Sequence, residues 1–101
     1  MNSEYFKEHI EEELEGALDY IKQAIEIKPM NSSWAKDFAE MSKNELEHAS
    51  GIYEKYGEYY GKLAKSYDMV PDCISEMWHD TATMYAELSA KVLHMHEMFN
   101  G

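Results

Sequence analysis

The sequence Glu45-Leu46-Glu47-His48-Ala49 lies in the middle of a long segment with helical periodicity and decides how the rest of the chain is interpreted. Glu45 and His48 are three positions apart, so on a helix their side chains point the same way, one turn from each other. A carboxylate and an imidazole at this spacing can bind one metal ion from a single helix. Apolar residues flank this pair, and an ionisable pair in an apolar stripe is costly unless it is paired or binds a metal.

The surrounding segment predicts one long helix over about residues 33–67. Glu45 falls near the middle of its apolar face and His48 at the edge of that face. Gly51, Gly57 and Gly61 each weaken a helix by about 1 kcal/mol relative to alanine, so a break near Gly57 or Gly61 remains an alternative. The other members of the apolar face are Trp34, Phe38, Met41, Ala49, Ile52, Tyr56, Tyr59, Leu63 and Tyr67.

The preceding segment predicts a second helix over about residues 3–28, which ends before Pro29. Its apolar face comprises Phe6, Ile10, Leu14, Ala17, Leu18, Ile21, Ala24 and Ile25. Most of its acidic residues lie off this face, but Glu13 falls within it. A short turn makes the two helices antiparallel, and Glu13 and Glu45 each lie about 16 residues from Pro29, roughly 24 Å along each helix. We therefore expect the two carboxylates and the imidazole of His48 to meet at one level.

Two carboxylates in one apolar layer repel each other, so without a cation at least one of them would have to be protonated. A bound Fe²⁺, Mn²⁺ or Zn²⁺ ion would balance the charge, and oxygen ligands with one nitrogen ligand suit iron or manganese. The alternative is a structural Glu–His ion pair or a hydrogen-bonded core histidine, because such groups produce the same pattern.

A third helix is predicted over about residues 71–99, with Pro71 in its first turn. It contains a second Glu-x-x-His match, Glu76 and His79, but this pair lies off the apolar face and is interpreted as solvated surface. Asp80 and Glu87 lie at the margin of that face and are weak candidates for additional ligands. The face itself comprises Ile74, Met77, Thr81, Met84, Leu88, Val92, Met95 and Phe99.

Two remaining groups of residues on this helix are not interpreted as sites. Cys73 is the only cysteine of the chain, and we interpret it as an inert thiol. His94 and His96 lie on different helix faces, so they do not form a helical metal-binding pair.

The stretch from Glu13 to Tyr20, followed by the motif at 45–49, resembles the first helix pair of rubrerythrin and its ferritin-like relatives. The resemblance covers about residues 5–56. It implies that Glu13 is a terminal metal ligand, Glu45 a bridging ligand and His48 the nitrogen ligand. Tyr20 would form a hydrogen bond beside the ligands. The implied activity is iron oxidation or the handling of peroxide or O₂, which would make the protein a ferroxidase- or peroxidase-type oxidoreductase.

The chain departs from this family because the family's four-helix bundle carries the ligand set twice, whereas the third helix here has no central carboxylate on its apolar face. One chain thus supplies half of a di-iron site. Two half-sites can meet across a homodimer, as in encapsulated ferritins, with two iron or manganese ions per dimer and zinc as a third option. A mononuclear or vestigial site is the alternative.

Length and composition limit the remaining possibilities. The 101 residues are enough for one domain, 1–101, with a modest core. A formal net charge of −11 disfavours nucleic acid and anionic membranes as partners and favours cations. No apolar run predicts a signal peptide or a membrane span, so we expect a cytoplasmic protein.

The sequence therefore predicts an all-α protein with a ferritin-like antiparallel helical hairpin plus a third long helix, completed to a bundle by homo-oligomerisation. The rival hypothesis is a non-catalytic helical interaction module with the same fold and no metal. In that case the acidic surface and the aromatic face would bind a protein partner.

Overall fold

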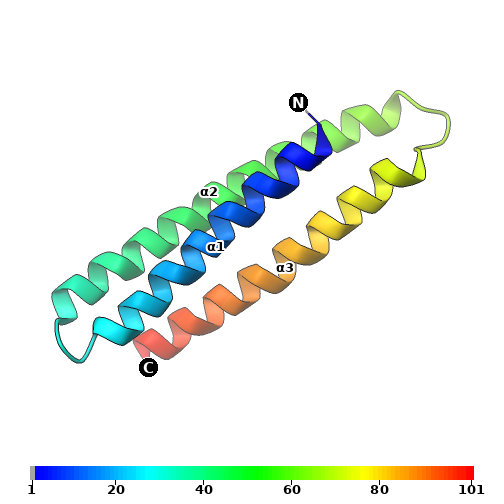
Figure 1. Cartoon of the computed structure of the whole chain (residues 1–101). Coiled ribbons are helices and arrows are strands. Elements are labelled where there is room, and N and C mark those ends of the chain that lie inside the picture. The colour runs from blue at the N-terminus through cyan, green and yellow to red at the C-terminus, as the bar shows by residue number, and fades with distance from the viewer. Residues whose placement is uncertain (1) are drawn as a thin grey trace.

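A computed structural model describes residues 2–101 and contains three long helices: α1 (Ser3–Ile27), α2 (Ser32–Lys65) and α3 (Asp72–Asn100). The helices follow one common long axis in up-down-up order (Figure 1). The molecule is strongly elongated, with principal extents of 58 × 19 × 16 Å. The all-α prediction is confirmed, and the helix bounds differ from the predicted ones by one or two residues.

The first two helices begin at side-chain caps. Asn2 Oδ1 accepts a hydrogen bond from the backbone N–H of Tyr5, and Asn31 Oδ1 accepts one from that of Trp34, each at 3.0 Å. Such caps satisfy N–H groups that have no partner within the helix. The second cap follows the turn at Pro29 directly, so α1 and α2 form the predicted hairpin. α2 then continues to Lys65 as one helix, so the alternative of a break near Gly57 or Gly61 is wrong.

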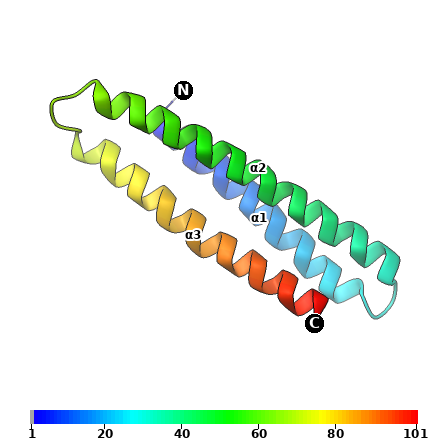
Figure 2. The same ribbon diagram turned by 180° about the vertical axis from the view of Figure 1, so that it is seen from behind.

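The first helix is the centre of the packing. The backbone of α1 runs close to both other helices, whereas the backbones of α2 and α3 come close to each other at few positions and are connected by side chains. In the two opposite views of Figures 1 and 2, α1 lies between its neighbours. One face of the α1–α2 pair is therefore covered by α3, and the opposite face of that pair is open.

The buried face of α2 agrees with the predicted one only in part. Ala49 and Tyr56 are buried as predicted, but Ala35, Ala39 and Ser42, which lie outside the predicted face, are buried as well. Trp34 and Met41, which the sequence assigned to the apolar face, are 59% and 44% exposed. The physical reason is packing distance, because small side chains allow two helix axes to approach closely. The wider residues are thereby rotated to the open face.

The third helix is attached to α2 mainly by aromatic rings. Tyr53 of α2 stacks on Tyr85 of α3, with ring centroids 4.2 Å apart and planes at 6°. Trp78 of α3 stacks on Tyr53 and Tyr60, at 5.5 and 5.1 Å, and meets Tyr56 edge to face at 5.0 Å. The Met- and Tyr-rich face of α3 is thus used for packing within the chain.

A buried serine joins all three helices at one point. Ser42 Oγ on α2 donates a hydrogen bond to the carbonyl oxygen of Ala17 on α1, at 2.6 Å, and lies 2.9 Å from Nε2 of His96 on α3. The hydroxyl has one proton, which goes to Ala17, so His96 must donate its Nε2–H to the serine. His96 Nδ1 is then an unprotonated nitrogen, which is buried and has no hydrogen-bond partner within the described residues 2–101.

Candidate metal centre

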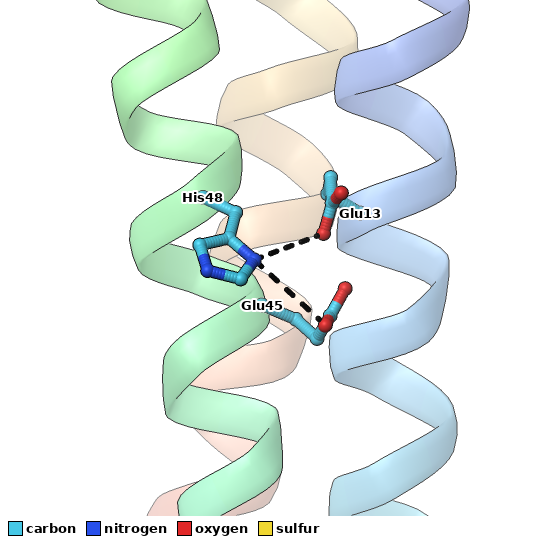
Figure 3. A network of polar contacts seen from close by, with 3 residues as sticks. All are labelled: Glu13, Glu45 and His48. Atoms are coloured by element: carbon cyan, nitrogen blue, oxygen red, sulfur yellow. Dashed lines mark ion pairs between the residues drawn. The ribbon is translucent and has the colours of Figure 1, made fainter.

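The structure brings together the three residues that the sequence selected. Glu13 comes from α1, and Glu45 and His48 come from adjacent turns of α2 (Figure 3). Each offers one ligand atom, and these atoms lie within 4.8 Å of one another. Nδ1 of His48 is 3.5 Å from Oε2 of Glu13 and 3.9 Å from Oε1 of Glu45. Among residues 2–101 no other group of three such side chains comes this close.

The two carboxyl groups affect each other strongly. A side-chain hydrogen bond with Glu13 raises the pKa of Glu45 above its usual range, and burial and the negative charge of Glu13 raise it further. His48 acts in the opposite direction on the same pKa. Oε2 of Glu13 is buried and has no hydrogen-bond partner among residues 2–101. The two carboxyl groups thus share the imidazole of His48 as a basic partner, and a cation at this point would add positive charge against their repulsion.

The centre lies in a groove at the surface of one chain. The side chains of Glu13 and Glu45 are 21% and 27% exposed, whereas that of His48 is 60% exposed. The groove is lined only by residues of α1 and α2, and α3 passes behind the ligands in Figure 3. The expected apolar surroundings are therefore present on one side only. The residues lining the groove are His9, Glu13, Glu47, His48, Gly51, Ile52 and Lys55.

Sequence reasoning missed His9, which lines this groove one turn before Glu13 on α1. The signal was its spacing of four residues from Glu13, which places both side chains on one helix face. The ring of His9 packs edge to face on Tyr5, with centroids 5.4 Å apart. His9 is therefore part of the wall of the groove, outside the group of three ligand atoms.

The other sequence candidates are not members of the group of three ligand residues. Glu76, His79, Asp80 and Glu87 are exposed on α3, so the interpretation of the second Glu-x-x-His match as solvated surface agrees with its position. Tyr20 is half-buried, and its ring lies against Phe38 with centroids 6.4 Å apart. Its role beside the ligands stays a prediction.

The chemistry of the donor set fits a transition-metal ion. Two carboxylates and one imidazole from two rigid helices combine hard oxygen ligands with one nitrogen ligand, a set that suits iron, manganese or zinc. Oε2 of Glu13, which is buried and has no hydrogen-bond partner in the described part of the chain, also fits, since such an oxygen gains most from coordination.

Comparison of the chain with protein-family models, with curated proteins and with solved structures gives no match. The structure itself shows a three-helix all-α protein with a Glu/Glu/His cluster. Within residues 2–101, no helix combines the length and the apolar character that crossing a membrane requires.

Proposed function

We propose that this protein binds a transition-metal ion through Glu13, Glu45 and His48, and that two copies of the chain complete a di-iron or di-manganese carboxylate centre between them. The observation that carries the proposal is the convergence of three ligand atoms from α1 and α2 within 4.8 Å. The resemblance of the sequence to rubrerythrin-like and encapsulated ferritin-like proteins supports the same ligand set.

Charge favours a metal over a structural ion pair. Two ionised carboxylates exceed the single positive charge that a protonated imidazole can supply. The hydrogen bond with Glu13, burial and the negative charge of Glu13 all raise the pKa of Glu45, so the site disfavours a second negative charge. A divalent cation would offset the repulsion between the two carboxylates and would coordinate the buried oxygen of Glu13.

The open face of the α1–α2 pair favours a second copy of the chain. Met41 lies one turn before Glu45, and Trp34 lies further along the same helix; both are exposed. A twofold axis near Glu45 would cover these side chains and bring the second copy's ligands to the first set, since a twofold interface places the same patch on both sides. Each chain supplies three protein ligands, which leaves coordination positions on the metal for ligands from the second copy.

In this centre the side chains have separate tasks. When bound, iron or manganese supplies the capacity for electron transfer to O₂ or peroxide. Glu13 and Glu45 hold the cation as carboxylates, and His48 provides the nitrogen ligand. Tyr20 is assigned a hydrogen-bonding role beside the ligands on the strength of the resemblance alone.

A second candidate function is a metal-free interaction module. The exposed aromatic and sulfur side chains of Trp34 and Met41 support it, because apolar groups at a surface often mark a protein interface. This module would use the same face, so the metal content of the protein separates the two functions.

The decisive experiment measures metal content in protein purified without chelator and after anaerobic loading with Fe²⁺. We expect one metal per chain in the wild type and none in Glu45→Ala. Glu76→Ala, which removes an exposed glutamate from the other Glu-x-x-His match, is the matched control and should bind as the wild type does. A wild type with no more metal than Glu45→Ala would refute the metal function. A stable monomer by light scattering would refute the shared site and leave a mononuclear one.

A further inference from the structure

Gly16 of α1 faces the carboxyl group of Glu45. A Cβ atom at position 16 would lie 3.2 Å from Oε2 of Glu45, 3.7 Å from its Cδ and 3.8 Å from its Cγ. The three nearest atoms all belong to this one side chain. The surface of α1 is therefore recessed where the ligand of α2 approaches it, and a methyl group would partly fill the recess.

The backbone gives no reason for a glycine here. Among residues 2–101 no glycine has a positive φ, so Gly16 has a conformation that any residue adopts in a helix. Glycine is also the weakest helix former apart from proline, and position 16 is in the interior of α1. Because neither conformation nor propensity favours glycine, the space next to Glu45 is the remaining structural reason.

The recess is part of the metal centre. Gly16 follows Glu13 by three residues, so both lie on the same face of α1, one turn apart. A contact at 3.2 Å is tighter than nine in ten real Cβ contacts, so a methyl group would displace the Glu45 carboxyl by a few tenths of an ångström. Metal coordination is sensitive to such displacements, because ligands must be held close to their productive geometry.

We infer that Gly16 is a positioning residue, which leaves the space that the Glu45 carboxyl needs to reach the level of Glu13 and His48. Its effect on metal affinity rests on the proposed function, whereas the contact itself does not. Gly61 offers a matched control, because a Cβ atom there would meet nothing within 4 Å and it lies far along α2 from the centre.

The test compares Gly16→Ala with Gly61→Ala in two measurements. Thermal unfolding of the metal-free proteins should show that neither substitution lowers the midpoint, and that Gly61→Ala raises it by about 4 °C through helix propensity. Co²⁺ titration against a competing chelator should show a dissociation constant raised about 10-fold in Gly16→Ala and unchanged in Gly61→Ala, a loss in the range expected for residues that support metal ligands. Loss of affinity without loss of stability is the signature of positioning.

Three results would overturn the inference: wild-type affinity in Gly16→Ala, an equal loss in Gly61→Ala, or a loss of helical structure in Gly16→Ala. An NMR measurement makes the inference independent of metal binding. In the metal-free wild type, the Hα atoms of Gly16 should show nuclear Overhauser contacts to the side-chain protons of Glu45. Absence of these contacts would overturn the inference, whereas their presence in a protein that binds no Co²⁺ would refute the proposed function alone.

Discussion

Nδ1 of His48 lies 3.5 Å from Oε2 of Glu13, although the two residues belong to different helices. This separation is too long for a strong hydrogen bond, and the glutamate oxygen is buried without another partner among residues 2–101. The carboxyl group of Glu45 shares a hydrogen bond with Glu13, and the two groups repel each other when both are ionised. Without a metal, the charged side chains of this centre therefore stabilise the folded protein less than uncharged side chains of the same shape would.

The first prediction concerns the repulsion between the carboxyl groups of Glu13 and Glu45. Glu45→Gln keeps the size of the side chain and removes its charge, so the metal-free variant should be more stable than the wild type by up to about 1 kcal/mol at neutral pH, a value kept small because the site is partly exposed. With Co²⁺ the order should reverse, because a metal stabilises only the folded protein that binds it. Thermal unfolding with and without Co²⁺ measures both effects.

The exposed Glu76→Gln variant is the control and should follow the wild type under both conditions. If Glu45→Gln instead lowers the stability of the metal-free protein, Glu45 belongs to a structural ion pair with His48, and the charge argument for a metal fails.

The level at which these ligands meet could be predicted because helical rise and a short turn fix it. Equal counts from Pro29 placed Glu13 beside Glu45 whatever the details of packing. The rotation of α2 about its axis could not be predicted in this way. It depends on how closely Ala39 and Ser42 let α1 approach, and a helical wheel treats small and large side chains alike.

For the same reason, the helical wheel did not reveal the buried contact between Ser42 and His96 that connects the helices. His96 lies between Val92 and Phe99 on the inner face of α3, a spacing that sequence analysis could have used. Its partner Ser42 is recognisable only once α2 is correctly rotated. The exposure of Trp34 and Met41 is a consequence of that rotation, and it bears directly on assembly.

The second prediction concerns assembly. Met41→Glu places a charge on the open face, one turn from Glu45, and should convert a homodimer into a monomer, because a like charge would face its own copy across a twofold axis. The helical content should be unchanged, since Met41 is 44% exposed in the single chain. Light scattering coupled to size-exclusion chromatography measures the mass.

Leu93→Glu is the matched control, because Leu93 is 55% exposed on α3, which takes no part in the metal groove. It should leave the mass unchanged. Dissociation by Leu93→Glu with retention of the dimer by Met41→Glu would place the interface on the other side of the molecule.

The third prediction concerns the attachment of α3. Trp78 stacks between Tyr53 and Tyr60 and meets the buried Tyr56 edge to face. Trp78→Ala should lower the free energy of unfolding by about 3 kcal/mol, as expected for the loss of a large packed ring. Trp78→Phe keeps a ring in the stack and should cost much less. Urea unfolding followed by circular dichroism measures both, and equal losses in the two variants would contradict the importance of stacking.

The last prediction concerns pH. Burial lowers the pKa of His96 below its usual value of 6.5, and the nearby positive charge of Lys43 lowers it further. The unfolded chain therefore takes up this proton more readily than the folded one. The contribution of neutral His96 to the free energy of unfolding is therefore complete above pH 6.5. It is lost as pH falls from 6.5 through the lower pKa of the folded state.

His96→Gln should be less stable than the wild type at pH 8, because it changes the buried hydrogen bond with Ser42. It should also lose less of its stability between pH 8 and pH 5.5, because its side chain takes up no proton on unfolding. His79→Gln, at an exposed position of the same helix, should keep the pH dependence of the wild type. Urea unfolding at the two pH values measures the difference. If the free energy of unfolding falls by the same amount in His96→Gln and in the wild type, then His96 is not buried in its neutral form where α1, α2 and α3 meet.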